Sequence, residues 1–392
     1  NPTMLGSWSV SGRHVGFRCT QLNLRSLRNL SSPEIPDRPS VDFLASRGSR
    51  LKIRSYSGFV DTQVITCRLG IVTFLLSAVV TLCNPLCLHP PPPMEDKLYL
   101  LQRHLPELLH LDALIRHGER HLRVSTVHEV PMGELSLPVR VIEMGSTSPG
   151  VPVIGFFGGV HGVERIGSQV LMSWLHSLIH RLQWDDQLHR RLEQVRLVFM
   201  PMINPGGIWK RTRSNPNGVD LMRNAPIDAM GRVPFLVGGH RISRHLPWYR
   251  GKSGAPMEPE AQAVIRVVQE KLMPAPFSMS LDCHSGFGRR DRIWCCYARS
   301  HRPIPHIGEV FRLKQHFEDT CTHHHPYLIE PQSVNYTTHG DLWDYLYDDA
   351  QERAPHHTFL PFTLEMGSWL WVRKNPRQRL DCFGYFNPVI GH

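Results

Sequence analysis

The amino-acid sequence predicts an α/β fold: a single domain with a mixed, largely parallel central β-sheet flanked by helices. Two observations support this prediction. Apolar runs typical of strands buried on both faces alternate along the chain with segments of helical spacing, as in strand–helix units. The 392 residues are 41% hydrophobic and 20% charged, which is an ordinary globular composition.

The first predicted elements are a helix and a pair of strands. Residues 94–118 have the amphipathic spacing of a helix, with Glu95 and Asp96 in the first turn, where the helix dipole favours acids. Residues 122–130 and 137–145 predict two strands, joined by a turn at residues 131–133. The domain is therefore expected to begin with a helix and a strand pair.

The following elements form the predicted centre of the sheet. Residues 151–160 are a continuous apolar run, as expected for a strand buried on both faces. The helix after this run is predicted to have one apolar stripe, formed by Ile166, Val170, Trp174, Leu178 and Leu182. Further strands are predicted at residues 195–203, 277–283, 292–298 and 359–366, and further helices at residues 258–272 and 307–317.

Residues 1–93 differ in composition from the rest of the chain. They carry 10 Lys or Arg against 4 Asp or Glu, and only two of the 24 histidines. An apolar run at residues 69–83 has the length of a signal-peptide core and is shorter than the roughly 20 residues that span a bilayer. We expect residues 1–93 to be a non-native or disordered leader, and residues 94–392 to be the working domain. A membrane anchor or an exported protein is the alternative if the apolar run is expressed.

The formal net charge of +10 does not indicate a nucleic-acid partner. Residues 94–392 carry 34 basic and 30 acidic side chains, so charge is nearly balanced where the domain is predicted. The five cysteines of this region are odd in number and lack the spacing of a disulfide framework. We therefore expect reduced thiols, a bacterial cytoplasmic location, and neither a nucleic-acid nor a membrane partner.

Polar side chains stand at the ends of three predicted strands. His161 and Glu164 follow the first buried strand in an H-x-x-E spacing, His284 ends another strand, and Glu365 closes the last one. Functional groups of α/β sheets gather past the carboxyl ends of strands. Two His and one carboxylate with an open position are typical of a catalytic zinc site, and a nearby carboxylate can then act as the base. The H-x-x-E spacing alone is weak evidence for a metal site, because chance matches are common in a chain with 24 histidines.

Further segments strengthen this interpretation because they occur in the order of a known family. They are GGVHGVE at 158–164, NPGG at 204–207, RSNPNGVDLMRN at 213–224, MEPE at 257–260, DCHSG at 282–286 and FTLEM at 362–366. With them, the chain resembles the zinc carboxypeptidase family, the carboxypeptidase A-like metallopeptidases, across roughly residues 135–370. The resemblance implies that family's fold, with one zinc ion held by His161, Glu164 and His284. It also implies Glu365 as the general base that assists a zinc-activated water.

The same resemblance implies further substrate contacts. Arg213 is expected to polarise the scissile carbonyl, with Arg211 as the alternative. Arg223 is expected to bind the terminal carboxylate of the substrate by bidentate hydrogen bonds. Tyr336 would close over the substrate, and Asn204 is expected among the substrate-binding residues.

Two departures from the family pattern leave the substrate open. Met222 stands before Arg223 where the family has asparagine, and a thioether donates no hydrogen bond. Val163 stands where the digestive enzymes carry arginine, which is closer to the bacterial murein-peptide and deacylase branches. We expect a metallocarboxypeptidase acting on a peptide with a free carboxylate. The alternatives are an N-acyl amino acid deacylase or murein-peptide amidase, and, from another class, a catalytically silent zinc-binding protein.

Overall fold

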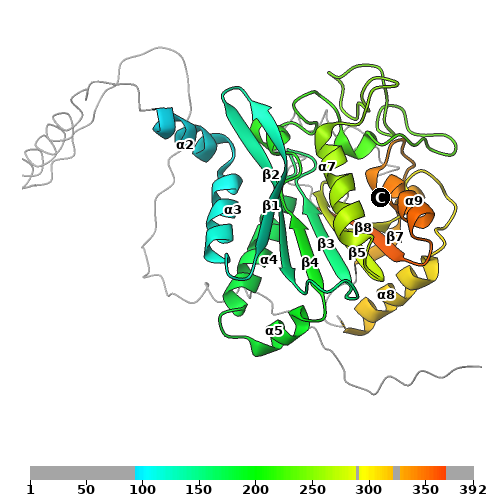
Figure 1. Ribbon diagram of the computed structural model, residues 1–392. Helices are drawn as coiled ribbons and strands as arrows, with labels where there is room; N and C mark the ends of the chain where they lie inside the picture. The colour runs from blue at the N-terminus through cyan, green and yellow to red at the C-terminus, as the bar shows by residue number, and fades with distance from the viewer. Residues whose placement is uncertain (1–92, 288–290, 321–326, 368–392) are drawn as a thin grey trace, which may run out of the picture. The chain divides into compact units, whose positions relative to one another are not determined.

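The computed structural model of the protein describes residues 93–287, 291–320 and 327–367 (Figure 1). Its strands are β1 (Arg123–Met132), β2 (Leu135–Gly145), β3 (Val153–Gly158), β4 (Arg196–Met200), β5 (Phe277–Ser285), β6 (Arg292–Cys295), β7 (Leu328–Pro331) and β8 (Thr358–Met366). Its α-helices are α2 (Pro93–His104), α3 (Pro106–His117), α4 (Arg165–Arg181), α5 (Asp186–Leu192), α6 (Pro205–Lys210), α7 (Pro259–Val267), α8 (Ile307–Thr320) and α9 (Leu342–Arg353).

The eight strands form one sheet in the order β1-β2-β4-β3-β5-β8-β6-β7. In the central group β4-β3-β5-β8, each strand is parallel to the next one. Strands β6 and β7 are also parallel to each other. The hairpin β1–β2, the pair β2–β4 and the pair β8–β6 are antiparallel. The sheet is therefore mixed and largely parallel, as the sequence predicts.

Helices cover both faces of the sheet. Phe156 of β3 contacts Trp174 of α4, with ring centroids 4.4 Å apart, whereas the adjacent Phe157 contacts Trp343 of α9 at 5.0 Å. Successive side chains of a strand point to opposite faces, so these two contacts lie on opposite sides of the sheet. Figure 1 shows α3, α4 and α5 on one side and α7 and α9 on the other.

The predicted opening helix is in fact two helices. The segment divides into α2 and α3 at Leu105, the residue before Pro106. Proline lacks a backbone N–H and disfavours a helical conformation at the residue before it, so it begins a new helix more readily than it continues one. The single-helix prediction was wrong for this reason.

The predicted apolar stripe of α4 was also wrong in part. Ile166 is 44% exposed, and Val170 and Trp174 are also exposed, although the Trp174 ring contacts Phe156. The buried face runs instead through Gly167, Ser168, Leu171, Met172, Leu175, Leu178 and Ile179. The helix carries two apolar rows, and only packing against the sheet decides which row is buried.

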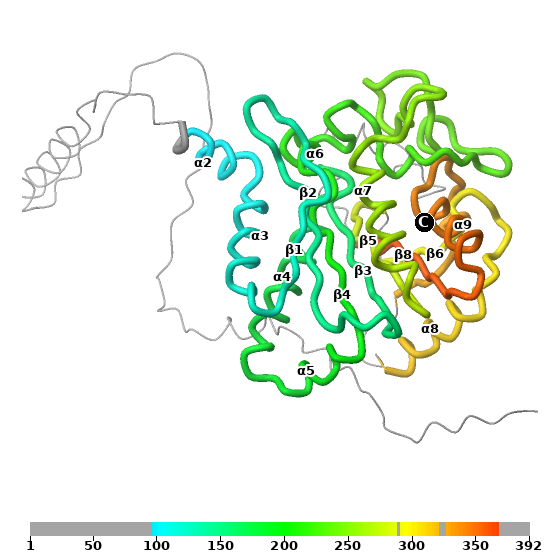
Figure 2. Tube along the Cα trace, in the orientation of Figure 1, coloured from blue at the N-terminus to red at the C-terminus, as the bar shows by residue number. Residues whose placement is uncertain are grey.

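Several elements escaped the sequence analysis. They are α5, α6, α9 and β7, together with the 3₁₀ turns η1 (Leu221–Arg223) and η3 (Gln332–Val334). The helix predicted at residues 258–272 is α7 followed by a π-helical turn, η2 (Val268–Leu272). Figure 2 follows the chain through the long loop-rich segment, drawn in green, between η1 and α7.

Some expectations fall outside the described residues. These include residues 1–92 of the leader predicted at 1–93, with its apolar run at 69–83, and the cysteines Cys321 and Cys382. Within the described residues, Cys283, Cys295 and Cys296 are free and buried. None of the helices in the described part of the chain is long and apolar enough to cross a bilayer.

Candidate metal centre and active site

The predicted metal ligands lie at the carboxyl ends of β3 and β5. His161 and Glu164 occupy the loop from β3 into α4, and His284 is near the end of β5. Because β3 and β5 are parallel neighbours, their carboxyl ends meet at the same edge of the sheet. All three side chains are buried.

Two glycines allow the ligand-bearing loop to pack closely. A Cβ atom on Gly162 would lie 2.0 Å from the carbonyl carbon of Gly207, and one on Gly167 would lie 2.1 Å from the carbonyl oxygen of Cys283. Neither approach leaves space for a side chain. Gly162, next to His161, thus lets the loop lie against α6, and Gly167, in the first turn of α4, lets this helix lie against β5.

The three ligand side chains converge. One ligand atom from each of His161, Glu164 and His284 lies within 4.8 Å of the other two, the only such group of three among the described residues. The Nδ1 atom of His161 is 3.0 Å from Glu164 Oε1, and the Nδ1 atom of His284 is 3.3 Å from Glu164 Oε2. Burial opposes ionisation of Glu164, but the two histidines outweigh it and hold the pKa of this carboxyl well below its usual value.

Two aspartates that the sequence analysis missed hold the opposite nitrogens of the two histidines. Asp220 Oδ1 lies 3.1 Å from Nε2 of His161, and Asp282 Oδ2 lies 2.8 Å from Nε2 of His284. Carboxylates of this kind fix the ring orientation and raise the basicity of a metal-binding histidine. The position of Asp282, two residues before His284 on one strand, was a signal for this pairing, since residues i and i+2 share a face.

Glu365 lies beside the third ligand. It is the register partner of His284 in the parallel pair β5–β8, so both side chains project from the same face of the sheet. Its side chain is buried, and Oε2 has no hydrogen-bond partner among the described residues. Burial raises the pKa of Glu365 to about 7, although the charge of His284 opposes this shift.

Of the two candidate arginines, Arg213 lies in the metal centre and Arg211 does not. Arg213 Nε donates to Asp220 Oδ2 at 2.8 Å, and its Nη1 donates to Glu164 Oε1 at 3.1 Å. Arg211 ends α6 in a left-handed conformation with an exposed side chain. Burial opposes ionisation of Asp220, but Arg213 and His161 hold its pKa well below the usual value.

Arg223 and Tyr336 lie close to each other and to Asp220. Burial disfavours the charged form of Arg223, but Tyr336 and Asp220 outweigh it and raise the pKa of this guanidinium. The Nε atom of Arg223 is buried without a hydrogen-bond partner among the described residues, as is Oδ2 of Asp341. Met222 is buried too, and its backbone N–H donates to Asp220 Oδ1 at 3.0 Å.

Asn204, which the sequence analysis placed among the substrate-binding residues, makes contacts that hold the ligand-bearing loop. Its side chain caps α6 by accepting from the Gly207 backbone N–H at 2.7 Å, and it donates to the Val160 carbonyl at 3.1 Å. The residue is fully buried. These contacts give Asn204 a role in holding the loop that carries His161.

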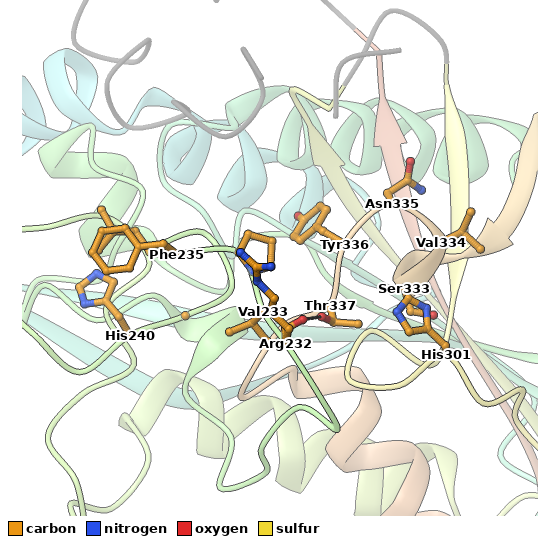
Figure 3. Close-up of a pocket in the computed structure, with 13 residues that line it drawn as sticks. Arg232, Val233, Phe235, His240, His301, Ser333, Val334, Asn335, Tyr336 and Thr337 are labelled. Atoms are coloured by element: carbon orange, nitrogen blue, oxygen red, sulfur yellow. Dashed lines mark hydrogen bonds between the residues drawn. The ribbon is translucent and has the colours of Figure 1, made fainter. Parts of the chain in front are cut away.

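A cavity of about 640 Å³ opens beside Tyr336. Figure 3 shows its lining, with Phe235 and His240 on one side and the segment Ser333 to Thr337 on the other. The two sides are joined by the hydrogen bond from Thr337 Oγ1 to the Arg232 carbonyl, at 2.9 Å. The cavity thus borders the residue that is expected to close over the substrate.

Comparison with known proteins matches residues 98–368 to the family described as zinc carboxypeptidase. Carboxypeptidase E of Caenorhabditis elegans is 26% identical over 188 residues, which are 43% of this chain and 38% of that protein. Carboxypeptidase SOL1 of Arabidopsis thaliana is 31% identical over 112 residues, which are 28% of this chain and 23% of that protein. The chain thus spans well under half the length of both relatives.

The fold is also similar to a solved structure. The crystal structure of thrombin activatable fibrinolysis inhibitor superposes with a TM-score of 0.50 and 16% sequence identity, over 72% of this chain and 71% of that one. At this identity the similarity concerns the fold alone.

Proposed function

The chain belongs to the zinc carboxypeptidase family, a family of hydrolases, and from this premise we propose that it cleaves an amide bond near a substrate carboxylate. The observation that carries the proposal is the meeting of His161, Glu164 and His284 beside Glu365, whose buried Oε2 has no hydrogen-bond partner among the described residues.

The donor set fits one zinc ion. Two imidazoles and a carboxylate are the ligands that Zn²⁺ takes in catalytic sites, where a further position stays open. When bound, zinc would supply a Lewis acid for the amide carbonyl and would lower the pKa of water. His161 and His284 would face the ion through Nδ1, because their Nε2 atoms are held by Asp220 and Asp282.

Glu365 is the proposed general base. Its Oε2 would accept a proton from the attacking water and pass this proton to the leaving nitrogen, which amide cleavage requires. The register pairing with His284 sets the distance from the base to the ligand group through the backbone. The burial of Glu365 also keeps bulk water from competing for its oxygen.

The arginines and Tyr336 are the proposed substrate contacts. Arg213, held by Asp220 and Glu164, would stabilise negative charge that develops on the carbonyl oxygen. Arg223 would pair with the substrate carboxylate, because its guanidinium is buried and its Nε lacks a partner among the described residues. Tyr336, between Arg223 and the cavity, would close over the bound substrate.

The variant Glu365→Gln tests the proposal. It should keep its zinc content, since Glu365 is not a ligand, and lose about 10²–10⁴-fold in kcat, the usual contribution of a general base. Metal analysis and turnover of amide substrates are measured side by side with the wild type. Full activity of the variant would contradict the assignment of the base. A wild-type protein that binds zinc but turns over no amide would support the silent zinc-binding alternative.

Met222 favours a second candidate function on the same site. An N-acyl amino acid deacylase or murein-peptide amidase also cleaves an amide near a carboxylate, and a buried thioether beside Arg223 cannot donate to a peptide terminus as asparagine does. Assays of free-carboxylate peptides beside acyl amino acids and murein peptides distinguish the two functions. Turnover of peptides alone would exclude the second candidate.

The variant Met222→Asn reports on the same choice. If the substrate terminus reaches Arg223, a new hydrogen bond to its charged carboxylate should raise kcat/KM for free-carboxylate peptides by about tenfold. The matched control is Met222→Leu, which has a similar volume and no donor. An equal response of the two variants would mean that the terminus does not lie at this position.

We also propose a cytoplasmic location. The three described cysteines are free thiols, as expected in a reducing compartment. Cell fractionation with an antibody to the domain would test this, and recovery in the exported fraction would exclude it.

A further inference from the structure

Four histidines gather on the outer surface of α3 and α4, apart from the metal centre. His110 and His117 belong to α3, and His176 and His180 belong to α4. All four side chains are exposed. The proposed mechanism uses none of them.

The two histidines of α4 have the spacing of a chelating pair. Residues four apart in an α-helix are neighbours on one face. The rings of His176 and His180 are accordingly close, with centroids 4.4 Å apart in an edge-to-face arrangement. Two imidazoles from one helical face can therefore reach a common ion without any change in the backbone.

A third imidazole comes from α3. The ring centroid of His117 lies 5.1 Å from that of His180. The next residue, Gly118, ends α3 directly against α4, since a Cβ atom there would lie 2.9 Å from Cδ1 of Ile179. This close approach of the two helices sets the distance between His117 and His180.

The two ring separations, 4.4 and 5.1 Å, are close to what one metal ion requires. With a zinc–nitrogen bond of about 2.0–2.1 Å and tetrahedral angles, the centroids of two imidazoles on one ion lie about 5 Å apart. In the metal centre, His161 and His284 are separated by 4.9 Å. The ring nitrogens of the surface histidines do not converge as placed, but exposed side chains change rotamer freely on a short timescale.

The local charges also permit a cation. Burial and the nearby His180, His110 and His117 lower the pKa of His176, which favours the neutral imidazole that binds metals. The amide nitrogen of Gln183 lies 3.1 Å from Nε2 of His117, so this ring nitrogen has a lone pair that a metal can take in place of the amide. The neighbouring Arg181 is paired with Asp185, with Nε 3.0 Å from Oδ2.

We propose that His117, His176 and His180 bind a second divalent transition-metal ion between α3 and α4, of the imidazole-preferring class that includes Zn²⁺, Ni²⁺ and Cu²⁺. His110 stands two turns before His117 on α3 and supplies a fourth imidazole near the site. The site is separate from the metal centre, because His176 lies 12 residues beyond Glu164, or roughly 18 Å along α4.

Zinc binding by the full chain tests this site. The protein is dialysed against micromolar Zn²⁺, and the bound metal is counted by elemental analysis in the wild type and in the double variant His176→Asn/His180→Asn. We expect the double variant to bind one equivalent fewer and to keep its amide hydrolysis. The histidine tract at residues 323–325 is present in both proteins, so it cancels in the difference.

Two further variants sharpen the result. The variant His117→Asn, on α3, should raise the Kd for the zinc ion that the double variant fails to bind. The variant His316→Asn, which removes an exposed histidine from α8, should change neither the number of zinc ions bound nor their Kd. Equal zinc content in the wild type and the double variant would overturn the proposal. So would an equal loss in the His316 control, or an unchanged Kd in His117→Asn.

Discussion

At the scale of single residues, the candidate metal centre includes side chains that would not bind the ion themselves. Asp282 accepts hydrogen bonds from both His284 and the indole of Trp343, whose Nε1 lies 3.0 Å from Oδ2. Asp220 is shared in the same way between His161 and Arg213. The orientation of both ligand rings is thus set by buried carboxylates, and each carboxylate is itself anchored by a second donor.

The first prediction concerns one of these carboxylates. Asp282→Asn should weaken zinc binding by about 10–100-fold, because an amide is a poorer acceptor for the ring N–H of His284. Competition with a chelator of known affinity measures the change. Asp319→Asn, an exposed substitution on α8, is the control and should bind zinc as the wild type does. Unchanged affinity in Asp282→Asn would show that His284 needs no anchor.

The sequence singled out the candidate ligands and the candidate base but not the side chains that hold them. His161, Glu164, His284 and Glu365 could be found because each ends a recognisable apolar run or begins the helix after one. His161 and Asp220 are 59 positions apart in the sequence, so no local sequence pattern could predict their contact. The distinction between Arg213 and Arg211 likewise depended on which side chain the turn after α6 buries.

At the scale of elements, α4 joins the metal centre to the core. Its first residue follows Glu164, and its buried face lies against β3 and β5. The sequence predicted the helix but chose a largely exposed row of apolar residues, because both rows satisfy the helical period. Strand positions were predicted well, whereas the place of β8 between β5 and β6 was not, since sequence order does not determine order in a sheet.

The corrected face of α4 gives the second prediction. Leu175→Ala should lower the free energy of unfolding by about 2–5 kcal/mol, because Leu175 is fully buried and its truncation leaves a cavity. Ile166→Ala, at a position 44% exposed in the same helix, should change it by no more than about 0.5 kcal/mol. Chemical denaturation measures both. A larger loss of stability for Ile166→Ala than for Leu175→Ala would instead support the buried face of α4 that the sequence predicted.

At the scale of the whole molecule, a metal ion would tie together segments that are distant in the chain. His161 and Glu164 precede His284 by more than a hundred residues, and the three meet only through the parallel pairing of β3 with β5. A ligand that binds only the folded state stabilises that state by mass action. The stability of the whole domain should therefore depend on zinc.

Removal of the metal should therefore lower the thermal stability of the domain. When the free zinc concentration is about 100-fold above Kd, zinc binding adds about 2.7 kcal/mol to the free energy of unfolding. Removal of the zinc by a chelator should therefore lower the melting temperature by roughly 5–10 °C. Calorimetry of the His176→Asn/His180→Asn variant isolates the metal centre from the proposed surface site. His284→Ala in the same background should show no zinc-dependent shift. A shift that persists there would locate the stabilising ion elsewhere.

The central position of β8 has a consequence for how the protein is made. This strand is the last described one along the chain, yet it lies in the interior of the sheet and carries Glu365. Until the ribosome has released it, β5 and β6 have no partner between them, and both expose an unpaired edge. By this point the nascent chain already contains its three candidate metal ligands, but it still lacks Glu365, the proposed base. With Glu365 as the proposed base, hydrolysis would begin only once this last strand has joined the sheet.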